Sequence, residues 1–445
     1  MAGKHDRRAA ASGGSTEPRG GALERRQVGL GAAGGLVERG LGLAAELAAG
    51  GGLVPAAPPR VATIACGWMQ ALAIGDDGSL WAWGSNLYAQ LGLGERSETL
   101  TPARVDDSGW SAISAAGEHG LGVKCDGSLW YWGAASESGL NITRRGFHTR
   151  PAQLGTGHDW LAVSAGREHS LALQRDGSLW SWGSRNYYGE LGHDGWIPPG
   201  TLTEVDEDAA LEVMSAAVNL GIHHFCRVGG ATEWAAVSAG GEHSLALKRD
   251  GSLWACGDNS HGQLGLGDKT RRRRLTRVGG EANWAALSTF YSHSLALKSD
   301  GSLWAWGWNE RRQLGFGDQI DRLEPTRVGD EAGWAVIGAG SRHSLALKDD
   351  GSLWAWGEND DGQLGLGDEA SRRAPTRVGG DCDWVAISAG HDFSLALKGD
   401  GGLWSWGSND WGALGVGDRT VRLAPTRVCA LTECGGHSFS TGSQS

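Results

Sequence analysis

Short stretches of alternating apolar and polar residues dominate the chain. Residues 344–348 (Ser-Leu-Ala-Leu-Lys) and 353–356 (Leu-Trp-Ala-Trp) both alternate with a period of two. This is the period of a β-strand, whose successive side chains point to opposite faces of a sheet. Between the two stretches, Asp350-Gly351 supplies residues that tolerate the positive φ angles of a tight turn. The pattern therefore predicts a β-hairpin.

The hairpin is one copy of a repeat. The sequence Asp-Gly-(Ser/Gly)-Leu-Trp occurs seven times, and successive copies are separated by 49, 50, 74, 50, 50 and 50 residues. The copies begin at Asp77, Asp126, Asp176, Asp250, Asp300, Asp350 and Asp400. Self-similarity at such a period indicates an array of small modules. Because every copy carries the repeated residues, we expect the function to depend on positions where the copies differ.

Each repeat predicts four short antiparallel strands. In the fullest copies, Trp334–Val378 and Trp384–Val428, these are the run after the first Trp, His/Phe-Ser-Leu-Ala-Leu, Leu-Trp-x-Trp and Pro-Thr-Arg-Val. One such unit cannot bury a core alone, and repeated all-β modules with periodic Gly and aromatic residues close radially. We therefore predict an all-β fold, a seven-bladed β-propeller of four-stranded antiparallel blades.

The tryptophans agree with this geometry. Of 23 Trp, 13 lie in the Trp-x-Trp positions and six more begin repeat units. Large rings suit the widening gap between neighbouring blades, so these 19 are interpreted as packing residues. Trp68, Trp196, Trp308 and Trp411 remain outside the pattern.

Three regions are predicted. Residues 1–58 form an Ala/Gly/Arg-rich tail that we expect to be mostly disordered, with a short helix near Val37–Ala49 as the alternative. The tail lacks the layout of a signal peptide, and nothing reaches membrane-spanning length. Residues 59–440 form the propeller with an insertion at about 193–227, and residues 441–445 form a second tail.

The sequence leaves two possibilities for how the ring closes. Residues 59–61 (Pro-Arg-Val) resemble the outer strand Pro-Thr-Arg-Val, and residues 434–438 (Cys-Gly-Gly-His-Ser) resemble the start of an eighth unit. Either terminus could complete the closing blade.

Charge and cysteine usage limit the classes of partner. The chain has 51 acidic and 40 basic residues, giving a formal net charge of -11. General nucleic-acid binding requires a basic field and is not expected, and no membrane partner is expected. The seven Cys are scattered without a repeated pair spacing, which favours a reducing compartment. We expect a cytoplasmic location, or a nuclear one if the source is a eukaryote.

The repeat resembles that of the regulator of chromosome condensation family. The resemblance is carried by Ser-Leu-Ala-Leu-Lys-x-Asp-Gly-Ser-Leu-Trp-Ala-Trp-Gly and by Gly-Gln-Leu-Gly-Leu-Gly-Asp at residues 262–268 and 362–368, and it covers about residues 60–440. It implies seven-bladed propellers. The family includes an exchange factor for a small nuclear GTPase, a plant ultraviolet photoreceptor, propeller domains of ubiquitin ligases and bacterial secreted inhibitors of β-lactamase, so the resemblance leaves the function open.

A histidine recurs at one position of the repeat and raises the question of a metal site. The residues are His119, His169, His243, His293 and His343, with Gln70 and Phe393 in the first and last copies. Zinc requires ligands within ~2.3 Å of one centre, whereas equivalent atoms of different blades lie far apart. Each His is therefore interpreted as a structural fastener. Cys429, Cys434 and His437 have only an approximate metal spacing. We predict no metal, cofactor or catalytic residues.

The differences among the copies gather on one face of the predicted disc. In an antiparallel four-stranded blade, the first and third connections open on one face, here called the variable face, and the Asp-Gly turn and the blade link open on the other. The insertion also falls on the variable face. Exposed aromatic and Arg side chains are typical of protein-binding surfaces. The candidate partner-binding residues are Trp68, Tyr88, Phe290, Tyr291, Trp308, Arg311, Arg312, Phe393, Trp411, Arg271, Arg272, Arg273 and Arg274, with Glu204 and Asp206 in the insertion.

Three functions are considered. The first is a non-enzymatic scaffold that binds another protein through the variable face. The resemblance alone implies the second, guanine-nucleotide exchange on a small Ran-like GTPase, and none of that family's exchange residues matches a motif here. The third is a Trp-based ultraviolet photoreceptor, although Trp68 is the sole Trp in the first-connection loops.

Overall fold

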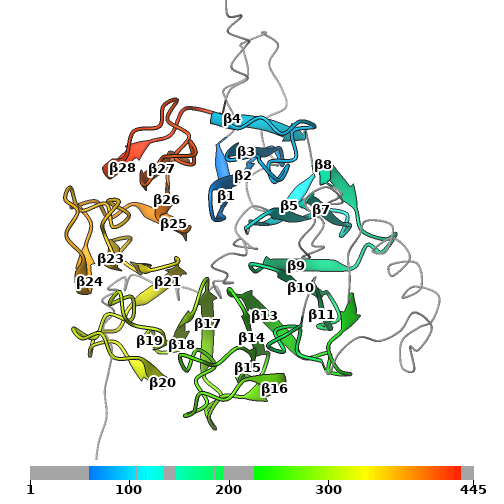
Figure 1. Ribbon diagram of the computed structural model, residues 1–445, viewed down its shortest axis with the longest axis vertical. Coiled ribbons are helices and arrows are strands. Elements are labelled where there is room, and N and C mark those ends of the chain that lie inside the picture. Colours follow the sequence, from blue (N-terminus) through cyan, green and yellow to red (C-terminus); the bar gives the residue numbers. More distant parts are fainter. Residues whose placement is uncertain are drawn as a thin grey trace, which may run out of the picture.

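The computed structural model describes residues 60–106, 109–115, 117–134, 147–183, 186–193 and 225–431. Within these residues the protein is a ring of seven sheets around a central axis (Figure 1). Each sheet consists of four antiparallel strands that are consecutive in the sequence. The predicted seven-bladed propeller of four-stranded blades is confirmed. None of the described residues forms a helix long and apolar enough to cross a membrane.

The strands follow in chain order. Blade 1 contains β1 (Val61–Cys66), β2 (Gln70–Gly75), β3 (Leu80–Gly84) and β4 (Thr99–Asp106), and blade 2 contains β5 (Trp110–Ala115), β6 (His119–Lys124), β7 (Leu129–Ala134) and β8 (Phe147–Gln153). Blade 3 contains β9 (Trp160–Ala165), β10 (His169–Gln174), β11 (Leu179–Gly183) and β12 (Cys226–Arg227), and blade 4 contains β13 (Trp234–Ala239), β14 (His243–Lys248), β15 (Leu253–Gly257) and β16 (Arg272–Arg277). Blade 5 contains β17 (Trp284–Thr289), β18 (His293–Lys298), β19 (Leu303–Gly307) and β20 (Arg322–Arg327), and blade 6 contains β21 (Trp334–Ala339), β22 (His343–Lys348), β23 (Leu353–Gly357) and β24 (Arg372–Arg377). Blade 7 contains β25 (Trp384–Ala389), β26 (Phe393–Lys398), β27 (Leu403–Gly407) and β28 (Arg422–Arg427).

The Asp-Gly turn has a fixed chemistry that explains the repeated sequence. In blade 6 the amide of Ser352 donates to Asp350 Oδ1 at 2.9 Å, and Trp354 Nε1 donates to Ser352 Oγ at 2.9 Å. Gly351 has a φ of +78°, in the region that favours glycine. Asp, Ser and Trp of this motif are thus joined by hydrogen bonds, Gly supplies the turn and Leu353 is buried, so this face of the disc varies little from blade to blade.

Tryptophans close the interfaces between blades, as their number predicts. Trp356 of blade 6 is fully buried, and its Nε1 donates to the carbonyl of Gln313 in blade 5 at 2.8 Å. Within blade 6, Lys348 Nζ lies 4.8 Å from the Trp334 ring centre and 4.4 Å from that of Trp354. Such cation–π contacts are attractive. In blades 2, 4, 5, 6 and 7 a Lys at this position therefore stabilises the first Trp of the unit and the first Trp of the Trp-x-Trp pair, whereas blades 1 and 3 have Gly75 and Gln174 there.

The recurring His is confirmed as a structural group. Nε2 of each one lies 2.8–3.1 Å from a Ser Oγ in the next blade: His119 with Ser170, His169 with Ser244, His243 with Ser294, His293 with Ser344 and His343 with Ser394. In the last of these pairs Ser394 Oγ donates its single proton to the carbonyl of Gln363, so it must accept from the imidazole N–H. Burial lowers the pKa of the five imidazoles to about 3 to 4. Among the described residues no group of three or more His, Cys, Asp or Glu is placed to hold a metal ion.

The ring closes between blade 7 and blade 1 without a shared sheet. The amide of Cys66 donates to Ser388 Oγ at 2.9 Å, and Trp83 Nε1 donates to the carbonyl of Ala413 at 2.8 Å. The expectation that residues 59–61 belong to an outer strand is wrong for Val61, which begins the inner strand β1. Val61 occupies the position where all six other units have Trp, and the following residues complete an inner strand. The tail, the interior of the insertion and the start of an eighth unit lie outside the described residues.

Candidate functional site

The variable face carries the residues that the repeat does not explain. The strand order 1-2-3-4 in each blade puts the first and third connections on this face, as the sequence indicates. First strands of neighbouring blades lie around the axis, and third connections lie farther out (Figure 1). Side chains of the first-connection loops can therefore meet across the axis, although they lie far apart in the sequence.

Trp68 makes such contacts with loops of other blades. Its ring centre lies 5.5 Å from that of His391 in blade 7 and 5.1 Å from the guanidinium carbon of Arg167 in blade 3. Trp68 also packs against the buried cluster that contains Phe290 of blade 5. One half-buried side chain thus contacts loops from both sides of the ring.

Aromatic side chains continue outward from the axis on the side of blade 5. Tyr291 packs against the same cluster as Trp68, and its ring centre lies 6.1 Å from that of Trp308. The Trp308 ring centre lies 5.9 Å from that of His261 in blade 4. Tyr291 and Trp308 are both half-buried, so part of each ring faces solvent. We call Trp68, Arg167, Tyr291, Trp308 and His391 the axial aromatic cluster.

Sequence reasoning selected Trp68, Tyr291 and Trp308 as candidates but left out Arg167 and His391. Arg167 was not among the candidates, although it occupies the loop position of Trp68, Tyr291 and His391. The variation at that single position is the signal that could have found it. Arg167 also lies 3.8 Å from the carboxylate of Glu242 in the neighbouring blade. The guanidinium of Arg167 therefore contacts both the Trp68 ring and the Glu242 carboxylate.

Two candidate residues are buried, which corrects their predicted role. Phe290 is 7% exposed and Phe393 is 2% exposed. Phe290 stands where five of the other six blades have Gly, and its larger side chain fills space beneath Trp68 and Tyr291. Phe393 occupies the position of the recurring His and packs in the core at the closure of the ring. Both residues support the surface from below and do not form it.

Arg311 and Arg312 line a polar pocket of about 260 Å³ between the third connections of blades 5 and 6. Arg311 and Arg342 hold the buried carboxylate of Glu358 at 3.1 and 3.4 Å. Burial raises the pKa of Glu358 even though the two guanidinium groups oppose the shift. Arg312 has a φ of +65°, at a position where four other blades have Gly. A non-Gly residue in this region stores backbone strain, which is a feature of functional loops.

The four consecutive arginines at residues 271–274 comprise one structural residue and three exposed ones. Arg272 Nη2 lies 2.6 Å from Asp268 Oδ2, and the same pair recurs as Arg322–Asp318, Arg372–Asp368 and Arg422–Asp418. Arg272 therefore belongs to the repeat, contrary to the prediction. Arg271, Arg273 and Arg274 are exposed at the outer strand of blade 4, away from the axis.

The remaining candidates are placed as follows. Tyr88 and Trp411 are half-buried on the third connections of the adjacent blades 1 and 7. Glu204 and Asp206 lie outside the described residues. Tyr88 and Trp411 are thus on the variable face.

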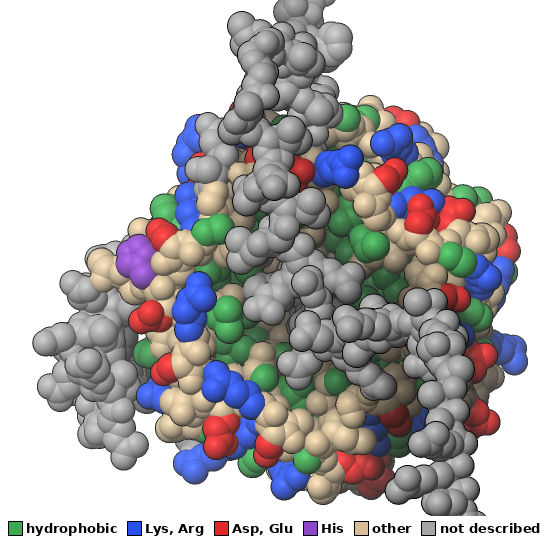
Figure 2. Space-filling model, turned by 180° about the vertical axis from the view of Figure 1, so that it is seen from behind, with side chains coloured by type: hydrophobic (Ala, Val, Ile, Leu, Met, Phe, Trp, Pro, Cys, Tyr) green, Lys and Arg blue, Asp and Glu red, His purple; other side chains and the backbone are tan. Residues whose placement is uncertain are grey.

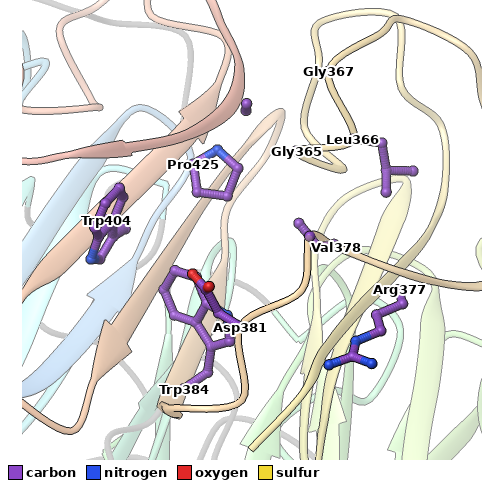
Figure 3. Close-up of a pocket in the computed structure, with 11 residues that line it drawn as sticks. Gly365, Leu366, Gly367, Arg377, Val378, Asp381, Trp384, Trp404 and Pro425 are labelled. Atoms are coloured by element: carbon purple, nitrogen blue, oxygen red, sulfur yellow. The ribbon is translucent and has the colours of Figure 1, made fainter.

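A larger pocket, of about 400 Å³, lies between blades 6 and 7 (Figure 3). Trp384, Trp404 and Pro425 line one part of it, and Leu366 and Val378 line another. Equivalent residues recur in blade pairs 4–5 and 5–6, because each belongs to the repeat. This pocket is therefore a feature of the scaffold and not a specific site.

The view from behind gives no evidence of a basic field. Lys and Arg side chains are interspersed with Asp and Glu around the periphery of the visible surface (Figure 2). Mixed charge of this kind does not provide the continuous positive surface that phosphate backbones require.

Comparisons with known proteins identify the family and the fold. Family models match the RCC1-like domain at residues 227–445 and the regulator of chromosome condensation (RCC1) repeat at residues 160–190 and 77–123. These matches fall in all seven blades. The Arabidopsis thaliana ultraviolet-B receptor UVR8 is 28% identical over 213 residues, which are 47% of this chain and 44% of the receptor. The chain thus spans less than half of this relative.

Solved structures agree in fold. Human WBSCR16 matches with a TM-score of 0.66 at 23% identity, covering 79% of this chain and 94% of WBSCR16. Prp20p from Saccharomyces cerevisiae matches with a TM-score of 0.62 at 21% identity, covering 77% of this chain and 84% of Prp20p. The repeat sequence, the seven blades and the family models lead to one conclusion: the chain belongs to the regulator of chromosome condensation (RCC1) repeat family.

Proposed function

We propose that this protein is an interaction scaffold that binds another protein through the variable face. The observation that carries the proposal is the axial aromatic cluster. Trp68, Tyr291 and Trp308 come from loops that the repeat does not require to be aromatic, and each keeps part of its ring at the surface. Arg167 and His391 hold the central ring of Trp68 in place.

The cluster has the physical properties of a binding hot spot. Trp, Tyr and Arg are the residue types that most often dominate the energy of protein interfaces. Here they lie on short loops between strands of a closed ring, so little side-chain freedom remains to be lost when a partner binds. The charged residues around them, Glu242 beside Arg167 and the Arg311–Glu358 pair, would surround an apolar centre with polar groups.

Similar proteins give independent support for a protein partner. Prp20p, which shares the fold, binds Gsp1p and histones. A GTPase is accordingly the first partner class to test in this chain. The likeness to UVR8 makes light-dependent assembly the second alternative.

The test compares variants of the cluster with a matched surface variant. Trp68→Ala, Tyr291→Ala and Trp308→Ala remove half-buried rings, whereas Val385→Ala removes an exposed apolar side chain, 44% accessible, at the start of β25 and outside the variable face. Each protein is used as bait in its native cell extract, and a captured protein is then purified for calorimetry. We expect the cluster variants to weaken binding at least about tenfold each.

The control defines what would contradict the proposal. Val385→Ala should bind normally, and all four variants should keep the wild-type thermal transition within a few degrees. If the cluster variants bind the purified partner as tightly as the wild type, the variable face is not the site. Acceleration of nucleotide release from a Ran-like GTPase would assign exchange activity, and dimer dissociation under ultraviolet light would assign photoreception.

A further inference from the structure

Three side chains from two neighbouring blades meet where blades 5 and 6 adjoin on the variable face. Arg311 of blade 5, two positions before the buried Gln313, reaches Arg342 and Glu358 of blade 6. Arg311 Nη1 and Arg342 Nη1 lie 3.1 and 3.4 Å from the Glu358 carboxylate. The amide of Glu358 also donates to the carbonyl of Arg342 at 2.9 Å. Two guanidinium groups therefore share one carboxylate at this junction.

The equivalent junction between blades 6 and 7 has the opposite charges. Asp361 of blade 6 stands at the position of Arg311, and Asp392 and Ser408 of blade 7 stand at the positions of the second Arg and the Glu. The amide of Ser408 donates to the carbonyl of Asp392 at 2.9 Å, so the backbone geometry is the same. Two carboxylates and a hydroxyl thus replace two guanidinium groups and a carboxylate. We call Asp361, Asp392 and Ser408 the acidic junction.

The acidic junction carries negative charge that its surroundings leave partly unopposed. Asp392 Oδ2 accepts from His391 Nδ1 at 2.5 Å, whereas Oδ1 is buried and accepts a hydrogen bond from no described residue. Burial raises the pKa of Asp361, and the neighbouring carboxylates of Asp392, Asp410 and Asp360 raise it further. A positive charge placed between these carboxylates would be attracted by all of them.

The arginines of the preceding junction do not supply that charge. The guanidinium of Arg342 attracts Asp392, but it already lies 3.4 Å from the Glu358 carboxylate, which also holds Arg311. Among the described residues, neither Asp361 nor Asp392 forms an ion pair with a Lys or Arg side chain. A cation from outside the protein can therefore complete the junction.

The acidic junction is accessible and adjoins the axial aromatic cluster. Its three residues are half-buried, and two further carboxylates beside them, those of Asp360 and Asp410, are exposed. His391, which holds Asp392, also contacts Trp68 at 5.5 Å between ring centres. One partner segment can thus contact the aromatic rings and the carboxylates together.

We propose that the acidic junction binds an arginine side chain of the partner protein, whose guanidinium supplies the positive charge between Asp361 and Asp392. This rests on the proposed function, because apolar residues beside that arginine contact the axial aromatic cluster. The planar guanidinium has several donors in a fixed fork, so it can donate to two carboxylates at once, whereas a lysine ammonium is a point charge. The partner is therefore a protein with an exposed segment in which Arg stands next to apolar residues.

The experiment uses the full chain and a fluorescent amidated peptide, Gly-Leu-Arg-Leu-Gly. A second peptide carries citrulline in place of Arg, which keeps the shape of the side chain and removes its charge. We expect the Arg peptide to bind with a Kd below about 1 mM and at least about tenfold more tightly than the citrulline peptide. Added salt should weaken the Arg peptide more than the citrulline peptide.

Variants assign this preference to the junction. Asp361→Asn and Asp392→Asn should each weaken binding of the Arg peptide about fivefold and leave the citrulline peptide unchanged. Asp361→Arg copies blade 5 and should abolish the preference for Arg. Asp330→Asn changes an exposed carboxylate on the opposite face and should have no effect. All four variants should keep the wild-type thermal transition or exceed it.

The outcomes distinguish this proposal from the proposed function. Trp68→Ala should weaken both peptides by the same factor. If it weakens neither while the preference for Arg remains, the acidic junction stands and the role of the axial aromatic cluster fails. Equal binding of the two peptides, no binding of the Arg peptide, or an undiminished preference for Arg in both Asp361→Asn and Asp392→Asn would overturn the proposal, whatever Trp68→Ala does.

Discussion

Glu190 is a buried carboxyl group on the variable face. Four other blades have Gln at this position, and Glu190 is 5% exposed between blades 3 and 4. Its Oε2 accepts from the amide of Tyr188, as the Gln side chains do in their blades. Burial is the largest cause that raises the pKa of Glu190, to about 7.

Replacing Glu190 with Gln should stabilise the protein at high pH. Because the folded pKa lies above the ordinary value of 4.5, the wild type loses stability as the pH rises from 4.5 through 7. The shift corresponds to about 3 kcal/mol above pH 8. Glu190→Gln removes this titration but keeps an acceptor for the Tyr188 amide. The variant should therefore gain up to that amount at pH 8 and about nothing at pH 4.5.

Urea unfolding of both proteins at the two pH values measures the difference. Glu310→Gln changes an exposed carboxylate on the corresponding connection of blade 5 and should have little effect at either pH. An equal gain from Glu190→Gln at both pH values would show that the carboxylate does not titrate as described.

Single residues also show where sequence reasoning ends. The recurring His was predicted to fasten the structure, but its Ser partner lies 51 residues away in four of the five pairs and 75 residues away in the pair that spans the insertion. The sequence nevertheless contains a signal of this His–Ser pairing. Where the first and last units replace His by Gln70 and Phe393, the next unit around the ring replaces Ser by Gly120 and Ala71. Donor and acceptor are lost together, and only ring closure shows that blade 1 follows blade 7.

At the scale of elements, adjacent second strands are joined by this His–Ser pair. A double-mutant cycle on His343 and Ser394 measures its strength. His343→Phe and Ser394→Ala copy the residues found at the closure of the ring. Ser394→Ala leaves the buried His343 Nε2 without its partner, and His343→Phe removes the donor to Ser394 Oγ, which still donates to Gln363. Loss of a buried hydrogen-bond partner costs about 1–3 kcal/mol.

The double variant should cost less than the sum of the two single variants, because it removes both polar groups together. Chemical unfolding gives the coupling energy, which should exceed about 0.5 kcal/mol. As the matched control, His343→Phe is combined with Ser244→Ala, which lies in a different pair, and these effects should simply add. Additivity within the His343–Ser394 pair would show that the contact contributes nothing specific.

The strands and turns could be predicted because the residues that determine them lie close together in the sequence. The period of two and the Asp-Gly turn lie within a few residues of each other, so the strands and their order follow from the sequence. The axial aromatic cluster is different. Trp68, Arg167 and His391 come from blades 1, 3 and 7, and their contact depends on the diameter of the closed ring. The sequence located variable loop positions but not which of them touch.

At the scale of the whole molecule, the five buried imidazoles make stability depend steeply on pH. Their folded pKa values of about 3 to 4 lie below the ordinary value of 6.5. Unfolding at intermediate pH therefore takes up protons, and stability falls as the pH drops from 6.5 towards 4. Each proton contributes about 1.4 kcal/mol per pH unit, so five together contribute about 7 kcal/mol per unit near pH 5.

We expect the slope of the unfolding free energy against pH, measured by urea unfolding between pH 5 and 6, to decrease by about 1.4 kcal/mol per unit in the His343→Phe, Ser394→Ala double variant. That variant loses one of the five titrating groups, while the carboxylates contribute equally to both proteins and cancel from the comparison. The slope is the informative quantity, since the double variant also changes stability at neutral pH. Equal slopes would mean that His343 binds its proton in the folded state, and that the ring of hydrogen bonds tolerates a charge. A smaller slope in the double variant would show that the imidazole at each of these blade interfaces takes up one proton when the protein unfolds in acid.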